Sequence, residues 1–463
     1  MNRPTSCSVG AFCFLIALLL ACSFDSAQAV IYVDADASGT ADGTSWTDAF
    51  TDLQNALSIA TAGDTVWVAD GTYKPTSGTN RAANFRLNDG VALFGGFAGV
   101  ETSLSERYMA AHPTVLSGEI GAFTKDDNSF HVVRSDSTDS TAVLDGFIIT
   151  RGNASGSAPD DKGGGMILVG ASPTVRNVSL RNNFATRGGG MSASKSRSTM
   201  SNVAFLGNYA NYGGGLYVYD GEGPVITNAS FAGDSVQTQG AAIYNLGSFP
   251  EIINTIVWAN TGITKVISLG GGVATFRYSD IEGSGGSIAW NPVIGIDGGH
   301  NIDVDPLFIS VVNRDAHLGL GSPAIDAGDA SAPNIPPTDL DGNPRIIGAG
   351  IDLGAYEFNN PTHIRGLEAP RTPRVTSVYP NPFNPTVTVS FELDRRRDVR
   401  IAVYDVGGRL VRTLLQKSAR DPGPHRVLWD ATDDAGRRMA SGVYFIEVQS
   451  NGWRDSRKVI LIK

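Results

Sequence analysis

The amino-acid sequence predicts an all-β protein: a parallel β-helix solenoid with an N-terminal helical cap, followed by a C-terminal β-sandwich. Three observations support this fold class. Glycine-rich tetrapeptides restart at Gly163, Gly188 and Gly213, 25 residues apart, and a degenerate copy begins at Gly240, 27 residues later. The segments between them alternate apolar and polar residues like half-buried strands. After Phe358 the composition changes, and a series of shorter strand-like segments follows.

A fixed period in the twenties is typical of a solenoid, in which each repeat covers its apolar edge with the next. Each repeat can hold three short strands and three turns, which make one coil of a parallel β-helix. Coils stack about 4.8 Å apart, so equivalent residues lie above one another. The glycine triplets lack the spacing and the following helix of a phosphate-binding loop, so we interpret them as turns.

Two polar columns follow the same period. The first consists of Asn177, Asn202, Asn228 and Asn254, and the second of Asn183, Asn208, Asp234 and Asn260. Amide side chains at one position of every coil can form a hydrogen-bonded ladder inside a turn. We therefore expect Asn202 and Asn228 to lie in adjacent coils, with their side chains within hydrogen-bonding reach.

The repeats resemble those of polymorphic outer-membrane proteins. A glycine-rich tetrapeptide is followed by Phe-x-x-Asn or a variant of it, as at residues 205–208. Residues 144–149 (LDGFII) are similar to the coil that opens such arrays, and residues 305–308 (DPLF), 322–328 (SPAIDAG) and 352–357 (DLGAYE) to the segment that closes them. The resemblance covers about residues 112–358 and implies the right-handed β-helix of the pectate-lyase-like superfamily. We assign residues 30–358 to this domain, with repeats at about 144–262 and a closing segment at 300–358.

Residues 1–29 have the pattern of a secretory signal peptide. Arg3 precedes an apolar stretch at 11–21, and an Ala-x-Ala cleavage site ends at Ala29. All three cysteines, Cys7, Cys13 and Cys22, lie in this segment, so cleavage leaves a mature chain without disulfides. Residues 19–22 (LLAC) also resemble a lipoprotein box, which leaves lipidation of Cys22 as an alternative. No other apolar run approaches the about 20 residues of a transmembrane span, so none is expected.

Residues 30–63 are expected to form the N-terminal cap, which covers strand edges that the first coil would otherwise expose. Residues 45–60 supply this cap, and residues near 51–60 are expected to be helical, with an apolar stripe of Leu53, Ala56, Leu57 and Ala60. Asp48 or Thr51 is the expected N-cap, and Gly63 ends the helix. Residues 64–73 are predicted to be the first strand and turn. We interpret Trp46 and Trp67 as buried cap aromatics, and sugar stacking on their rings is the alternative.

Residues 359–374 contain three prolines and are predicted to be a linker. Beyond it, strands are expected at 375–379, 386–393, 399–404, 410–415, 426–429, 443–448 and 457–462, with the spacing of a β-sandwich. Four motifs occur here in order: 379–385 (YPNPFNP), 403–411 (VYDVGGRLV), 441–445 (SGVYF) and 458–463 (KVILIK). They resemble a type IX secretion C-terminal sorting domain, which is related to the Ig-like domain of the flagellar hook-capping protein. The resemblance implies that residues 375–463 engage the secretion machinery and that the protein is displayed on the outer surface of a Gram-negative-type bacterium.

Charge differs between the two parts of the chain. From Asn359 onward, 18 Lys and Arg outnumber 11 Asp and Glu, whereas the preceding residues hold 18 basic and 35 acidic residues. An acidic body argues against a nucleic-acid partner. The acidic surface also fits calcium-rich surroundings.

The resemblance to pectate lyases implies an acidic cluster that binds Ca²⁺ and an Arg or Lys base on one face of stacked coils. The candidates for such a site are Asp160, Asp161, Lys162, Arg151, Arg176, Arg181 and Arg187. Their spacing does not place them in one column with a carboxylate pair, so a solvated charged face is favoured and the catalytic residues stay unknown. His131 alternates with apolar neighbours and is interpreted as a strand residue. The six histidines form no zinc-binding motif.

Asp339, Asp341 and Asn343 have the oxygen-rich spacing of a calcium loop, and Asp326, Asp329 and Asp352 in the same segment could add ligands. The segment lacks the glycine at position 6 and the glutamate at position 12 of an EF-hand loop. A structural turn with Asx caps is favoured, and a structural Ca²⁺ is the alternative.

These observations favour a secreted, cell-surface, non-catalytic rod that acts as an adhesin or binds an extracellular polysaccharide or surface partner. The alternative is a secreted polysaccharide lyase or glycoside hydrolase, since a fold does not determine a function. The sequence names no ligand.

Overall fold

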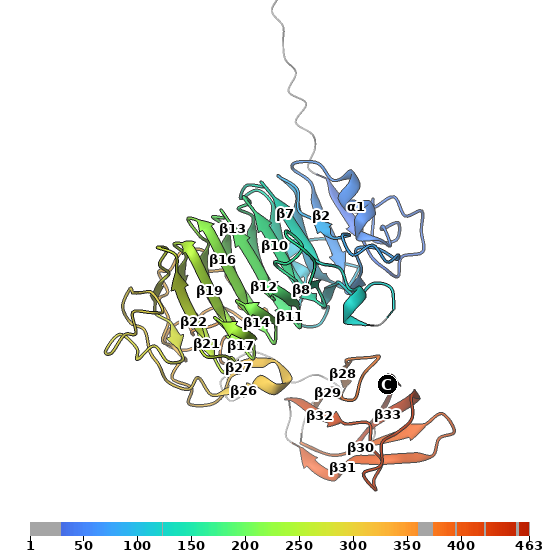
Figure 1. Ribbon diagram of the computed structural model, residues 1–463. Helices are drawn as coiled ribbons and strands as arrows, with labels where there is room; N and C mark the ends of the chain where they lie inside the picture. The colour runs from blue at the N-terminus through green and yellow to red at the C-terminus, as the bar shows by residue number, and fades with distance from the viewer. Residues whose placement is uncertain are drawn as a thin grey trace, which may run out of the picture.

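The computed structural model describes residues 29–122, 124–359, 374–393, 396–420, 423–450 and 453–462. The predicted signal peptide, including Cys22, and the predicted linker lie almost entirely outside the described residues. Figure 1 shows a rod of stacked strands formed by the part of the chain before the linker, and a separate set of strands, coloured red, formed by the C-terminal part. The described residues contain one short α-helix against 34 strands, which confirms the all-β class.

The rod is built from three sheets of parallel strands, and its central coils contribute to all three. Sheet A is the largest, with 14 strands. Its strands are β1 (Val30–Val33), β2 (Thr65–Ala69), β3 (Gly71–Tyr73), β5 (Ala92–Phe97), β6 (Thr114–Ser117), β8 (Val143–Thr150), β11 (Thr174–Arg181), β14 (Thr199–Leu206), β17 (Val225–Ala232), β20 (Glu251–Ile253), β21 (Ile256–Trp258), β23 (Thr275–Arg277), β24 (Asp280–Ile281) and β25 (Ile296–Asp297).

Sheets B and C are narrower, with seven and four strands. Sheet B contains β4 (Phe85–Arg86), β7 (Val133–Asp136), β10 (Met166–Val169), β13 (Met191–Ser194), β16 (Leu216–Gly221), β19 (Ile243–Ser248) and β22 (Val266–Leu269). Sheet C contains β9 (Asn153–Ala154), β12 (Phe184–Arg187), β15 (Tyr209–Tyr212) and β18 (Ser235–Gln239). The chain therefore forms the predicted right-handed parallel β-helix.

One coil passes through the three sheets in turn. From β13 in sheet B the chain continues to β14 in sheet A and to β15 in sheet C, and a glycine triplet then leads into β16, one coil further along. The register stacks equivalent residues, since Met166 pairs with Met191 and Met191 with Leu216. Inside the rod these side chains join one apolar core, in which Phe205 and Phe231 stack with ring centroids 4.3 Å apart.

The turns use the residues that their backbone geometry requires. The chain in sheet A bends at Asn177, Asn202 and Asn228, within β11, β14 and β17, and at Asn254, between β20 and β21. The φ angles of these four residues lie between 50° and 54°. Asn adopts this left-handed conformation at lower cost than most residues, and the strand pairing skips each of these positions. At the corner between sheets C and B, Gly188 has a φ of 68°, and a Cβ on Gly189 would lie 2.4 Å from the carbonyl oxygen of Tyr209. The glycine triplets are therefore tight turns.

A short helix, α1 (Leu53–Ile59), covers the first coils, and Leu53, Ala56 and Leu57 pack into the rod core. Three predictions for this region were wrong. The helix ends at Ile59 with Ala60 as its C-cap, and not at Gly63. The N-cap is Asp52, whose side chain accepts the backbone N–H of Gln54 at 2.9 Å. The side chain of Asp48 instead accepts hydrogen bonds from Thr40 and Ser45 of the preceding loop. The first strand is β1, inside the segment predicted to be the cap, and it pairs in parallel with β2.

Trp46 and Trp67 belong to an aromatic cluster that also contains Tyr32, Phe94 and Phe97. Trp67 is 7% exposed and stacks on Phe97 with centroids 4.7 Å apart. The indole N–H of Trp46 donates to the carbonyl oxygen of Glu101 at 2.8 Å. Both rings serve packing, and Trp67 has too little exposed surface to stack on a sugar.

The closing segment packs along the outside of sheet A. It contains the antiparallel strands β26 (Phe308–Ser310) and β27 (Asp315–Leu318), joined by the 3₁₀ helix η3 (Val311–Asn313). Ala355 and Tyr356 pack on outward-facing apolar residues of β14 and β17, namely Ala204, Leu206 and Ala232. The segment is held internally by a buried ion pair of 3.1 Å between Arg345 and Glu357. Two further 3₁₀ helices, η1 (Leu104–Glu106) and η2 (Lys125–Asp127), lie in loops of the N-terminal coils.

The C-terminal domain has the seven predicted strands, arranged in two antiparallel sheets around one core. The three-stranded sheet contains β28 (Arg374–Tyr379), β29 (Val387–Leu393) and β32 (Gly423–Trp429). The four-stranded sheet contains β31 (Leu410–Arg420), β30 (Arg397–Asp405), β33 (Gly442–Ser450) and β34 (Trp453–Leu461). Most strands are longer than predicted, because the predicted ranges covered only the apolar stretches, whereas the strands continue into the polar residues that flank them.

Candidate functional site

Part of the predicted charged set meets at the corner between sheets C and B. The carboxylate of Asp161 lies 2.6 Å from Nζ of Lys162, and its other oxygen pairs with the guanidinium of Arg187. Lys162 and Arg187 are neighbours in adjacent coils, joined by a parallel β-bridge. We call Asp161, Lys162 and Arg187 the charged corner.

The remaining predicted charges lie elsewhere and have partners of their own. Arg176 is 2.6 Å from Asp145, a buried carboxylate that also accepts from Arg107 at 2.8 Å. Arg151 pairs with Glu119. Nε of Arg181 donates to the hydroxyl of Ser179 at 2.5 Å. The structure therefore does not gather the arginines around a carboxylate pair.

His131 is not a strand residue, contrary to our interpretation of the sequence. It precedes β7 and is buried under the next coil, where Nδ1 lies 3.0 Å from the carbonyl oxygen of Gly163. Its Nε2 is 3.4 Å from Asp160. Burial lowers the pKa of this imidazole, so it is neutral near pH 7.

Four tyrosines continue the charged corner along the rod: Tyr212, Tyr217, Tyr219 and Tyr244, which we call the tyrosine strip. Tyr212 follows Arg187 in the register of sheet C, and Tyr217 pairs with Tyr244 in sheet B. The rings contact one another, with centroid distances of 5.1 to 5.5 Å. The strip and the charged corner thus form one surface along several consecutive coils.

The four side chains of the tyrosine strip differ in how much of their surface is exposed. Tyr212 and Tyr219 are half-buried, whereas Tyr217 and Tyr244 are 5% and 8% exposed and support them. Burial raises the pKa of Tyr217 to about 12, so its phenol remains a proton donor at neutral pH. Within the described residues no hydrogen bond uses the phenol oxygens of the strip. Nζ of Lys162 lies 6.0 Å from the ring of Tyr219.

This surface has the chemistry of a sugar-binding platform. Aromatic rings offer an apolar face with specific geometry, and their hydroxyls hydrogen-bond at the wet edge. The charged corner adds two cations and one carboxylate that can bind hydroxyl or carboxylate groups. The tyrosine strip was missed by our sequence reasoning, although Tyr217 and Tyr244 hold the same position after consecutive glycine-rich turns.

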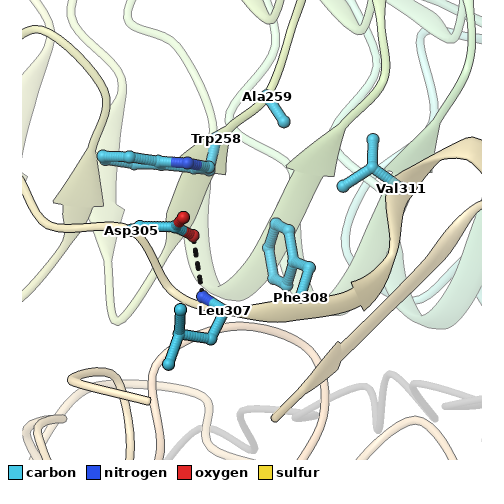
Figure 2. A pocket seen from close by; sticks show the side chains of 6 residues that line it. All are labelled: Trp258, Ala259, Asp305, Leu307, Phe308 and Val311. Carbon is cyan, nitrogen blue, oxygen red and sulfur yellow. Dashed lines mark hydrogen bonds between the residues drawn. The ribbon is translucent and has the colours of Figure 1, made fainter.

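A pocket of about 370 Å³ lies on another side of the rod, where the closing segment meets the end of β21. Figure 2 shows Trp258 and Ala259 on the rod side, and Asp305, Leu307, Phe308 and Val311 on the closing segment. Asp305 accepts the backbone N–H of Leu307 at 2.9 Å. Leu307 has a φ of 53° and is exposed.

The first asparagine column is not a continuous ladder. Nδ2 of Asn202 donates to Oδ1 of Asn177 at 2.9 Å, and that of Asn254 to Oδ1 of Asn228 at 3.4 Å. Among the described hydrogen bonds none joins Asn202 to Asn228, although their coils are adjacent, so that part of the expectation was wrong. The closing segment intervenes: its carbonyl oxygens at Thr338 and Asp352 accept from Asn202 and Asn228 at 2.6 and 3.1 Å.

The second column is continuous and contains a carboxyl group. The backbone N–H of Asn183, Asn208 and Asp234 each donates to the side-chain oxygen of the next member, the last being Asn260. Asp234 is fully buried, and burial raises its pKa to about 8. Oδ2 of Asp234 has no partner among the described atoms. At the equivalent position of the next coil, Nδ2 of Asn260 donates to the carbonyl oxygen of Phe231.

Asp339, Asp341 and Asn343 do not fit a calcium site. Both carboxylate oxygens of Asp339 already accept N–H groups, from the backbone of Asp341 and Asn343 and from that of Glu357. Asp341 lies 2.7 Å from Nε2 of His317. Asp326, Asp329 and Asp352 likewise accept backbone N–H groups of the closing segment. Throughout the described ranges no group of three or more His, Cys, Asp and Glu is arranged to hold a metal ion.

Among the described residues no helix has the length and apolar character needed to cross a membrane. No curated protein matches the chain. Residues 380–452 match the model of the FlgD Ig-like domain, which identifies the C-terminal sandwich as Ig-like.

Three solved structures are similar to parts of the chain. Pectate lyase Pel9A is 15% identical over 72% of this chain and 97% of its own, with a TM-score of 0.43. A rhamnogalacturonan lyase is 14% identical over 55% of this chain and 68% of its own, with a TM-score of 0.37. Dimeric latent PorU from Porphyromonas gingivalis is 27% identical over 21% of this chain and 10% of its own, with a TM-score of 0.18. At these scores the similarities carry no functional argument.

The β-helix itself matches a family model. Residues 36–278, from the cap through the repeats to β23, match DUF1565, described as a protein of unknown function. Because this model spans more than half of the chain, the protein belongs to the DUF1565 family.

Proposed function

We propose that the protein is a secreted, surface-displayed rod that binds an extracellular polysaccharide without cleaving it and so acts as an adhesin. The observation that carries the proposal is the tyrosine strip with its adjoining charged corner. Aromatic rings, unpaired phenol hydroxyls and cations lie together on the outside of consecutive coils. A polymer that lies along the rod can contact several coils at once, and each added contact strengthens binding.

The arrangement of charges favours binding over catalysis. Lyase or hydrolase chemistry needs a base or a carboxylate pair with a suitable pKa, placed to reach the scissile group. Asp161 is tied to both cations of the charged corner, and Arg151 and Arg176 are held by other carboxylates. His131, the nearest imidazole to this region, is buried.

Export through the C-terminal domain is the second part of the proposal. It rests on the four motifs of residues 379–463 and on the match to the FlgD Ig-like model. The repeats that resemble those of polymorphic outer-membrane proteins are consistent with display on the outer surface. The domain also carries excess positive charge, so its surface differs from that of the acidic rod.

Affinity electrophoresis of the purified protein against a panel of neutral and acidic polysaccharides tests the binding function. We expect retardation by at least one polysaccharide, with no release of reducing ends and no absorbance from unsaturated products. Product formation that is lost in an Asp161→Asn variant would instead establish the lyase or hydrolase alternative. Absence of retardation by every polysaccharide would contradict the proposal.

A further inference from the structure

We propose that the pocket between Trp258 and Asp305 is a second carbohydrate site and that it receives a sugar residue bearing a protonated amine. This inference deepens the proposed function, because it assumes a glycan-binding protein. It concerns a site other than the tyrosine strip, at the junction of β21 and the closing segment rather than at the corner between sheets C and B.

The pocket combines an aromatic ring with a carboxylate. Trp258 is half-buried and Asp305 is exposed, and Figure 2 shows the carboxylate next to the indole. Oδ1 of Asp305 accepts the N–H of Leu307, which fixes the side chain. Oδ2 accepts no hydrogen bond from any described residue, so one carboxylate oxygen is available for a ligand.

The opposite wall is apolar and is held in an unusual backbone conformation. Phe308 and Val311 pack against outward-facing residues of β14 and β17, which anchors the wall to the rod. Leu307 is 44% exposed and has a φ of 53°, a left-handed conformation that a branched residue seldom adopts. Such conformations persist where the surrounding structure imposes them, often at ligand sites.

The electrostatic surroundings favour a cation. Asp280 is buried in the neighbouring coil, accepts the N–H of Val304, and has a second oxygen without a partner among the described atoms. Burial, together with the negative charges of Asp303 and Asp305, raises the pKa of Asp280 to about 7, so these three carboxyl groups make the local potential negative. Of the basic side chains nearby, Lys265 lies 3.6 Å from Glu282, and the guanidinium of Arg314 lies against Gly207 of an earlier coil.

These features select the class of ligand. A protonated amine is attracted both by the face of an indole ring and by a carboxylate, whereas an acidic sugar would be repelled by Asp305. The apolar wall and the ring accept the C–H face of a pyranose, which a small inorganic cation cannot use. A hexosamine with a free amine satisfies all three contacts, and its N-acetylated form loses the charge.

Titration calorimetry of the whole protein at pH 6 tests this inference, with the β-1,4-linked glucosamine tetramer as probe and its fully N-acetylated form as the uncharged comparison. We expect the free-amine tetramer to bind about tenfold more tightly, the ratio that one charge-assisted hydrogen bond supplies. Asp305→Asn keeps an oxygen for the N–H of Leu307 and should abolish the preference. Trp258→Ala should weaken binding of both tetramers.

Two further variants make the result specific. Glu222→Gln removes one exposed carboxylate remote from the pocket and should leave both affinities unchanged. Combined Tyr212→Ala and Tyr219→Ala should leave tetramer binding intact even if it abolishes polysaccharide binding, so failure of the strip and failure of the pocket are distinguishable. Equal affinities for the two tetramers, no binding of either, or an unchanged preference in a folded Asp305→Asn variant would overturn the inference.

Discussion

Asn202 joins the closing segment to the rod: its Nδ2 lies 2.9 Å from Oδ1 of Asn177 and 2.6 Å from the carbonyl oxygen of Thr338. The same relationship recurs at Asn228 and Asn254, whose amides donate to carbonyl oxygens at Asp352 and Asp329. The first asparagine column therefore serves two purposes. It bends the strands of sheet A, and it supplies the donors that fasten the closing segment to the outside of the rod.

Replacing Asn228 tests both purposes. Asn228→Leu should lower the free energy of unfolding by about 1–3 kcal/mol through lost hydrogen bonds, with a further contribution from strain at positive φ. Asn228→Gly loses the same bonds but tolerates the backbone, so it should be the less damaging variant. Chemical denaturation of both variants and the wild type measures the difference. Equal loss in the two variants would show that the backbone conformation is unimportant.

Asp234 should make stability depend on pH. Its pKa rises from 3.8 to about 8 on burial, so the folded protein binds a proton that the unfolded chain releases above pH 4. Stability should therefore fall as pH rises through the window between these two values. Asp234→Asn replaces the protonated carboxyl group with the amide found in the rest of the column and should remove this dependence. The test is to measure the melting temperatures of the wild type and of Asp234→Asn from pH 4 to 8.5. If the two plots of melting temperature against pH are parallel, Asp234 is not the source of the pH dependence.

Removing one partner of the buried Arg345–Glu357 ion pair should destabilise the closing segment more than replacing both partners. Burial raises the pKa of Glu357 to about 8, so Arg345→Met leaves this carboxyl group buried, protonated near neutral pH and without its partner, which costs about 1–3 kcal/mol. Adding Glu357→Leu to that variant should recover part of the loss, because no unpaired polar group remains. Limited proteolysis reports release of the closing segment, and unfolding curves report the energy. A double variant less stable than Arg345→Met would contradict this account.

Deleting residues 375–463 in the native host tests the proposed route of export. We expect the rod to accumulate in the periplasm, because the motifs that resemble a sorting domain lie in the deleted part. Resistance to proteolysis in cell fractions would confirm that the truncated rod still folds. Unchanged display at the cell surface would exclude the sorting role and favour lipidation at Cys22 as the anchor.

The sequence predicted the rod well because the repeats stack in register. Inward positions such as Met166, Met191 and Leu216 occupy one column, so a period of 25 residues placed each strand in its sheet. The sandwich was predicted for a similar reason, since its strands contribute apolar side chains to one core. Local signals of this kind do not depend on distant contacts.

Features that depend on contacts distant in sequence were missed. The break in the first asparagine column arises because a segment 124 residues further along the chain supplies a competing acceptor for Asn228, the carbonyl oxygen of Asp352. Outward-facing Ala204, Leu206 and Ala232 are apolar, which was a signal that something covers sheet A. The N-cap was misassigned because Asp48 and Asp52 are equally good candidates by type, and only the loop geometry separates them.

The central claim is that the tyrosine strip binds polysaccharide. The most direct measurement is the dissociation constant of the protein for a retarding polysaccharide, compared with that of the combined Tyr212→Ala and Tyr219→Ala variant. Both rings are half-buried, so the variant should fold, and its melting temperature provides the control. Loss of two aromatic contacts should weaken binding about tenfold or more. An unchanged dissociation constant in the folded variant would contradict the account.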